Sequence, residues 1–243
     1  MAAILVTIMQ PAYLPWLGYF DRILASELFV VLDHVRVDLN SRTKFANRNR
    51  VRTKEGWSWL TVPLQTKGHA LELNKLSINN AQPWQSKHWQ TIQHCYGKAR
   101  HFSDYAAELK SFYERPVENL VQLTKPMTEY FLRALSIGVP VYYSSQLPIA
   151  GEKQDLIVNI CKHFGATGYL SGPFGRDYLN AEQFERMGID LQFHDYQHPQ
   201  YPQCWPGFEP FMAIIDLLFN CGGDAREIFR SPQSISRKAA LQS

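Results

Sequence analysis

The chain has 243 residues, 45% of them hydrophobic and only 19% charged, and a chain of this length can bury a core without disulfides or a structural metal. Its 25 Lys and Arg residues against 22 Asp and Glu give a net charge of +3, well short of the basic excess of most nucleic-acid-binding domains. Composition and charge therefore argue against a disordered chain and against nucleic acid as the partner.

The first part of the chain alternates strand and helix patterns. The apolar run 3–9 is rich in β-branched residues and ends at Gln10-Pro11, which predicts a strand buried on both faces. Apolar residues recur at helical spacing over 17–26, and a second apolar run, 28–35, predicts another strand. Strand, helix and strand in this order form a βαβ unit, which places the two strands parallel in one sheet.

The middle of the chain breaks this alternation. Two alternating segments, 47–53 and 57–64, flank the turn Lys54-Glu55-Gly56 and predict a β-hairpin. Residues 80–137 have the pattern of three helices. The predicted starts of these helices are Pro83, a capping Ser103, and Thr124 with Pro126.

The alternation returns in the second half of the chain. Three segments have the apolar character of strands: 139–144, 167–171 and 189–196. Three segments have helical spacing: 152–164, 181–187 and 210–220. Glycines that suit the left-handed helix C-cap follow them: Gly165, Gly188 and Gly222-Gly223.

These patterns predict an α/β fold with a predominantly parallel, Rossmann-like sheet and an inserted β-hairpin and helical lobe at about 47–137. We expect residues 1–230 to form a single domain and 231–243 a polar C-terminal tail. The four cysteines lie far apart without a CxxC pair, which predicts free thiols in a reducing compartment. The N-terminal residues lack the basic start of a signal peptide, and no apolar run reaches 18 residues, so we expect a cytoplasmic protein without a membrane partner.

Polar residues follow the predicted strands, at the edge of the sheet where ligands bind in open α/β folds. The candidate substrate-binding residues at or near these strand ends are Gln10, Tyr13, Tyr19, Ser144, Ser145, Ser171, Gly172 and Tyr196. Loops of such sheets are polar in general, so a structural role is the alternative for each residue. The sequence SGPFG at 171–175 is a weak phosphate-loop candidate, and a turn is the plainer interpretation.

Asp33 and His34 directly follow the second predicted strand and are the candidate catalytic residues. Either could act as a general base, since imidazole titrates near neutrality. Their side chains are expected to face opposite sides because they are neighbours in an extended segment. The alternative is a hydrogen-bonded structural pair. The spacing of His194 and His198 resembles a metal-ligand pair, but it falls across a strand end and a loop, so we expect no metal site.

The first strand of the predicted hairpin carries Arg48, Arg50 and Arg52 at alternate positions, and these side chains are expected on one face. Guanidinium groups on one face could hold a diphosphate or a carboxylate through paired hydrogen bonds. A solvated edge strand that is protected from aggregation by its charge is the alternative.

Several motifs together resemble one known family. In chain order they are MQPAYLPWLGYFDRI, VLDHV, NRNRV, WSWLTVP, KHW, YGKA, SSQL, YLSGPFG and FEPFMAIIDLLFN, and they extend over residues 8–220. This pattern resembles the WbqC-like family. The resemblance implies a function in bacterial surface-polysaccharide or O-antigen biosynthesis, such as the attachment of an aminoacyl group to an amino-sugar.

A weaker similarity concerns the HIGH superfamily of nucleotidyltransferases and ligases, in which an HxGH motif follows the first strand. Here Trp16-Leu17-Gly18-Tyr19 occupies that place, and both histidines are replaced. The similarity therefore suggests a HUP-like fold with a different pocket, and whether this segment binds a nucleotide stays open.

We expect an acyl or aminoacyl transferase, or an amide-forming ligase, that acts on a nucleotide-activated amino-sugar. Asp33 or His34 would deprotonate the amine, and Arg48 and Arg50 would hold the phosphate-bearing substrate. The cofactor stays open, with ATP and a thioester acyl donor as candidates, as does contact with a carrier protein or a second copy of the chain. The alternative is a non-catalytic binding or assembly module that contacts a partner protein through the aromatic loop QHPQYPQCWPGF.

Overall fold

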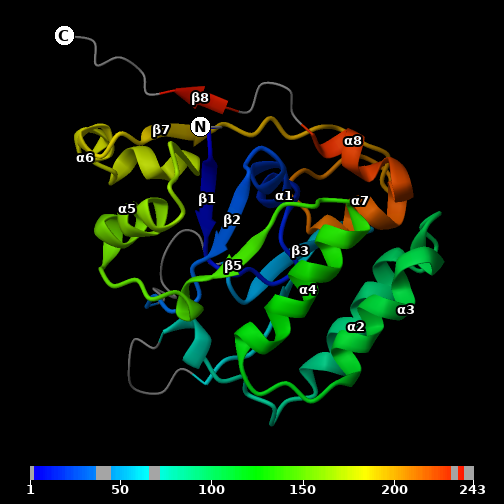
Figure 1. Ribbon diagram of the computed structural model, residues 1–243. Helices are drawn as coiled ribbons and strands as arrows, with labels where there is room; N and C mark the ends of the chain where they lie inside the picture. Colours follow the sequence, from blue (N-terminus) through cyan, green and yellow to red (C-terminus); the bar gives the residue numbers. More distant parts are fainter. Residues whose placement is uncertain (1–2, 37–44, 66–71, 231–234, 238–243) are drawn as a thin grey trace.

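A six-stranded sheet forms the centre of the protein, in a computed structural model that describes residues 3–36, 45–65, 72–230 and 235–237 (Figure 1). The strand order is β5-β2-β1-β6-β7-β8, and the first five of these strands are parallel. Their bounds are β1 (Leu5–Met9), β2 (Leu28–Val31), β5 (Val141–Tyr143), β6 (Gly168–Ser171) and β7 (Asp190–His194). The predicted α/β fold with a mainly parallel sheet is confirmed.

The sheet separates two hydrophobic cores because successive side chains of a strand point to opposite faces. In β2, Val30 belongs to one core, whereas Phe29 and Val31 belong to the other. Helices α5 (Lys153–His163) and α6 (Ala181–Arg186) cover the first face.

The second face is covered by more helices, as Figure 1 shows. These are α1 (Leu17–Leu24), α7 (Ile214–Cys221) and α8 (Ala225–Phe229), together with the helical lobe α2 (Trp84–Tyr96), α3 (Phe102–Glu114) and α4 (Leu120–Ala134). No helix in the described ranges is long and apolar enough to cross a bilayer.

The β-hairpin is a separate two-stranded sheet, made of β3 (Arg48–Thr53) and β4 (Gly56–Thr61). Its register places Arg50 opposite Trp59. Val51 and Leu60 are buried in the larger core, so the hairpin packs on the domain rather than projecting from it. The hairpin and the helical segment therefore follow the prediction.

Two predicted helix starts are wrong. Helix α3 begins at Phe102, so Ser103 lies inside its first turn and does not cap it. Helix α4 begins at Leu120, because the Asn119 side chain and the Gln122 side chain form a capping box that satisfies the first amide groups. Pro126, predicted near the start of this helix, lies inside it.

Strand boundaries also differ from the prediction. Strand β2 ends at Val31. Leu32 N–H still donates to the Met9 carbonyl of β1, but Asp33 N–H donates to the Val31 carbonyl and to Ser144 Oγ instead of to a neighbouring strand. A short strand, β8 (Ile235–Arg237), pairs antiparallel with β7. It lies in the segment expected as a polar tail, where no strand was predicted.

Candidate functional site

The parallel strands bring the predicted site residues to one edge of the sheet. In the order β5, β2, β1, β6, β7, the residues at or after the strand ends include Ser144, Asp33, Gln10, Ser171 and Tyr196. Neighbouring strands lie about 4.8 Å apart, so β5 and β7 are separated by about 19 Å. These residues share an edge, but they cannot all surround one small ligand.

Asp33 forms the centre of a hydrogen-bonded cluster at the β5–β2 end of this edge. Its Oδ1 accepts from Ser144 Oγ at 3.0 Å and from Ser145 N–H at 2.9 Å, and its Oδ2 accepts from Ser145 Oγ at 2.6 Å. Both serines belong to the single turn η2 (Ser144–Gln146) that follows β5. The buried carboxylate therefore ties the end of β2 to the end of β5.

His34 joins this cluster through Ser144, with 2.7 Å between His34 Nδ1 and Ser144 Oγ. Ser144 has one proton, which it donates to Asp33, and it also accepts from Asp33 N–H. His34 therefore donates from Nδ1, and in the neutral ring this tautomer has its lone pair on Nε2. The two side chains meet on one serine, so the expectation that they face opposite sides is wrong: the strand has already ended at Val31.

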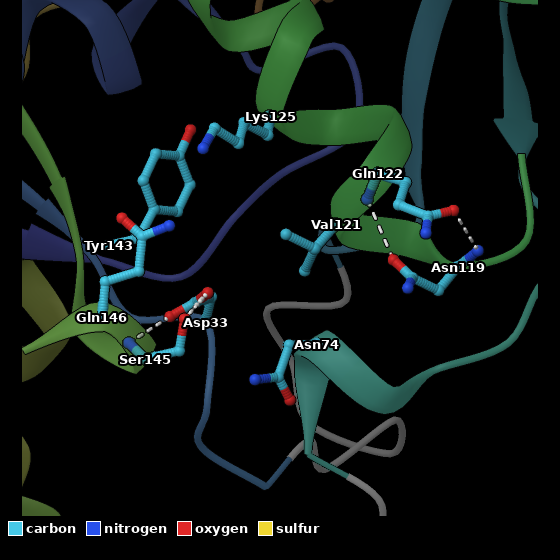
Figure 2. Close-up of a pocket in the computed structure, with 9 residues that line it drawn as sticks. All are labelled: Asp33, Asn74, Asn119, Val121, Gln122, Lys125, Tyr143, Ser145 and Gln146. Atoms are coloured by element: carbon cyan, nitrogen blue, oxygen red, sulfur yellow. Dashed lines mark hydrogen bonds between the residues drawn. The ribbon is translucent and has the colours of Figure 1, made fainter.

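A pocket of about 280 Å³ lies beside the cluster (Figure 2). Its lining residues are Asp33, Asn74, Asn119, Val121, Gln122, Lys125, Tyr143, Ser145 and Gln146. The Lys125 amine lies 4.3 Å from the centre of the Tyr143 ring, and Figure 2 shows the two side chains next to each other. Asp33 and Lys125 supply one negative and one positive group to the same pocket.

Two buried polar atoms of this pocket have no hydrogen-bond partner in the described part of the chain. The Tyr143 hydroxyl and Asn74 Oδ1 are buried without a hydrogen bond among the described residues. Burial raises the pKa of Tyr143, so its hydroxyl keeps its proton and can donate. Buried polar groups are almost always bonded, so these two indicate a polar ligand or ordered water.

Tyr13 and Tyr19 lie in the core rather than in this pocket. The hydroxyl of the fully buried Tyr13 is 2.8 Å from His88 Nδ1 and 2.7 Å from the Tyr113 hydroxyl. Burial lowers the pKa of His88 to about 4, so this cluster is uncharged near neutrality. Tyr19 donates to the Gln10 carbonyl at 3.3 Å. Both phenols therefore hold the loop after β1 in place.

The remaining predicted residues lie outside the pocket of Figure 2. The side chain of Gln10 is exposed, Ser171 is buried and Gly172 begins the next turn. Tyr196 donates its hydroxyl to the Phe229 carbonyl at 3.0 Å, so that group is used inside the fold.

The three hairpin arginines have two different environments. Arg48 lies 4.3 Å over the Trp59 ring, and Arg50 lies 5.0 Å over the Trp57 ring. Arg52 is buried and donates to the carbonyls of Thr53, Gly56 and Pro206 and to the Gln203 side chain. Arg52 thus fastens the hairpin to the loop at 200–208, so the predicted face of three available guanidinium groups is reduced to two.

A buried Asp–His pair was missed by the sequence analysis. Asp21 Oδ2 and His194 Nε2 are 2.7 Å apart, and each side chain is only 3% exposed. The available signal was Asp21 itself, an acidic residue on the same helix face as Leu17, Phe20 and Leu24.

A second, open pocket of about 560 Å³ lies along the aromatic loop at 200–208. Exposed rings of Trp57 and Phe211 belong to neighbouring segments, since Arg50 contacts both residues. Within the described ranges, no group of three or more His, Cys, Asp or Glu residues is placed to hold a metal ion.

Comparisons with known proteins agree with the motif resemblance. The model of the WbqC-like protein family matches residues 10–228. An uncharacterized protein of Mycobacterium tuberculosis, Rv1507c, is 33% identical over 227 residues, which cover 93% of this chain and 97% of that protein. No solved structure matches the chain. The similarity extends over both halves of the sheet and over the inserted hairpin and helices.

Proposed function

The chain belongs to the WbqC-like protein family, and from this premise we propose that it transfers an acyl or aminoacyl group to the amine of a nucleotide-activated amino-sugar in surface-polysaccharide biosynthesis. The observation that carries the proposal is the chain of contacts from His34 through Ser144 to Asp33, the member of the chain that lines the pocket of Figure 2. A fixed imidazole beside a polar pocket suits a reaction that needs a general base.

The proposed reaction uses His34 Nε2, the nitrogen that keeps its lone pair. The amine nitrogen forms a bond to the acyl carbon of the donor, and His34 takes the proton that the amine loses. The bond from the acyl carbon to the leaving group breaks, and the leaving group departs with the electron pair and takes up that proton. A thioester or an acyl phosphate provides such a leaving group, so the donor stays open between a thioester and an ATP-derived intermediate.

The other pocket residues would bind the substrate. Lys125 can pair with a negative group, while the Tyr143 hydroxyl and Asn74 Oδ1 can bond sugar hydroxyls or an amide. Asp33 holds Ser144, and through it the orientation of His34, so it is a positioning residue in this proposal. Arg48 and Arg50, the phosphate contacts expected from the sequence, lie on the hairpin outside this pocket.

The test is product formation by the purified protein. Nucleotide-activated amino-sugars are incubated with thioester donors, and with carboxylic acids plus ATP, and the amide product is measured by mass spectrometry. We expect His34→Gln to lower the rate by about 10²- to 10⁴-fold. The matched control is His163→Gln, on the exposed surface of α5, which should keep the rate. Equal rates for both variants would contradict the role of His34.

A non-catalytic binding module is the second candidate, and the open pocket along the aromatic loop at 200–208 favours it. Such a module would bind an activated sugar or a partner protein without consuming a donor. Saturable binding of the sugar without amide product, over the whole donor panel, would support this second candidate.

A further inference from the structure

Arg22 is a cation that pairs with no carboxylate in the part of the chain that the structure describes. It lies on α1, half-buried, and its Nε donates to Met9 Sδ at 2.9 Å. Within the described ranges, no Asp or Glu oxygen lies within ion-pair distance of its guanidinium. Its charge instead acts on the phenols of Tyr19, Tyr169 and Tyr178, and burial lowers the pKa of Arg22. A partly desolvated charge is costly without a counter-ion, so an anion would stabilise this site.

The guanidinium is held against the loop that follows β6. A methyl group placed on Gly172 would lie 2.4 Å from Arg22 Nη1, so glycine is needed for this close approach. The loop continues as the single turn η3 (Pro173–Asp177). Within it, a Cβ on Gly175 would meet Ser171 Oγ at 2.1 Å. The loop is therefore packed tightly around the Arg22 side chain and the end of β6.

The position in the sheet points to a ligand as well. After β1 the chain builds β2 and β5 on one side, and then returns to place β6 on the other side of β1. The strand order thus reverses between the ends of β1 and β6. Open α/β sheets bind ligands at this point. Met9 and Gly172, which contact Arg22, lie at the ends of these two strands.

Exposed aromatic rings lie on the loop that follows β6. The Tyr178 side chain is 65% exposed and close enough for the Arg22 charge to act on its phenol, and Phe174 is 59% exposed on the same turn. Large exposed rings next to a cation are typical of sites that stack a nucleobase above its phosphates.

We propose that Arg22, held against Gly172, binds the diphosphate of a nucleotide, and that the Tyr178 ring stacks on its base. The inference rests on the proposed function in one respect: the nucleotide that binds at this subsite is the one that the activated sugar carries. The inference thus places the diphosphate between the ends of β1 and β6 rather than on the hairpin. On the hairpin, Arg48 and Arg50 already lie over tryptophan rings.

The test is calorimetric binding without an acyl donor, so its result does not depend on His34 or on turnover. Uridine, thymidine, guanosine, cytidine and adenosine diphosphates are titrated into the protein, with pyrophosphate and the free nucleosides as separate arms. We expect at least one nucleoside diphosphate to bind, and Arg22→Met to weaken it by about 10- to 150-fold through the loss of charge-assisted hydrogen bonds. At the same concentration, the bound nucleotide should raise the Tm of the wild type more than that of this variant.

Gly172→Ala is the second variant. It keeps every charge, and its methyl group displaces the Arg22 guanidinium from its position against the loop after β6. This variant should also bind the nucleotide more weakly. It tests the proposed site if Arg22→Met fails to fold. Tyr178→Ala should weaken the nucleotide and leave pyrophosphate unchanged. The matched control is Arg186→Met, an exposed arginine on α6, which should bind within about twofold of the wild type.

Three results would overturn the inference. The first is that no diphosphate binds the wild type at millimolar concentration. The second is that Arg22→Met and Gly172→Ala bind like the wild type, or that only Arg50→Met loses affinity, which would place the anion on the hairpin. The third is that pyrophosphate binds as tightly as the best nucleotide, which would show that the base adds nothing to the binding.

Discussion

The protein contains two Asp–His arrangements at the same edge of its sheet. They differ in sequence separation, in how the two side chains are bonded and in their access to solvent. Asp33 and His34 are neighbours in the chain and meet through Ser144, and Asp33 lines a pocket. Asp21 and His194 are 173 positions apart, bond directly at 2.7 Å and are sealed from solvent. In the first arrangement His34 Nε2 has no partner among the residues that the structure describes, whereas in the second His194 Nε2 bonds Asp21 inside the fold. Environment, rather than the pair itself, separates a candidate base from a structural contact.

The largest expected effect is on the sealed pair. Asp21→Ala leaves His194 buried without its partner, and we expect the free energy of unfolding to fall by about 3 kcal/mol. Asp21→Asn, which keeps a hydrogen-bonding oxygen, should lose less. Urea denaturation measures both changes. A loss below about 1 kcal/mol for the alanine variant would mean that the Asp21–His194 contact does not stabilise the fold. The distinction between this pair and Asp33–His34 would then be wrong.

A third buried carboxyl group, without a histidine, sharpens the comparison. Asp216 Oδ2 accepts from Tyr201 and Gln203, whereas Oδ1 has no partner among the described residues. Burial raises the pKa of Asp216 from 3.8 to about 6. Because the folded value is higher, the stabilising contribution of the protonated form is complete below pH 4 and is lost as the pH rises through 6.

Asp216→Asn should therefore remove this pH dependence. We expect the stability of the variant relative to the wild type to rise by about 3 kcal/mol between pH 4 and pH 7.5, since about two pKa units separate the folded and unfolded values. Urea denaturation at several pH values tests this. A difference that stays constant with pH would show that folding does not raise the pKa of Asp216.

A smaller effect is expected at the bridging serine. Ser144→Ala removes a buried hydroxyl that bonds both Asp33 and His34, and it should lower the free energy of unfolding by about 1 to 2 kcal/mol. Transfer activity should fall as well, because His34 loses its orienting contact. Ser86→Ala is the matched control, since this exposed serine lies on α2 and, among the described residues, bonds only the Pro83 carbonyl. Equal losses of activity in both variants would remove the special role of Ser144.

The sequence predicted the features that depend on local patterns. The apolar runs before Gln10 and before Asp33 predicted β1 and β2, and the alternation around Gly56 predicted the hairpin. The start of α4 was missed, because Asn119 and Gln122 form a capping box while Thr124 and Pro126 also look like a helix start.

The contacts of the candidate site depend on distant residues. Asp33 and Ser144 are 111 positions apart, and only the parallel pairing of β2 with β5 brings them together. Arg50 and Arg52 look equivalent in an alternating strand, yet Arg52 is buried by a loop 150 residues later, around Gln203 and Pro206. Tertiary contacts of this kind decide which member of a predicted set stays available for a ligand.

The most direct test of the account measures His34→Gln and His194→Gln side by side, for the free energy of unfolding and for the rate of amide formation per folded molecule. We predict that His34→Gln lowers the rate by at least about 100-fold and changes stability by no more than about 1 kcal/mol. His194→Gln should lose about 3 kcal/mol of stability and keep the rate. The opposite pattern, with the rate lost in His194→Gln and kept in His34→Gln, would contradict the assignment of the site to the β2–β5 end of the sheet.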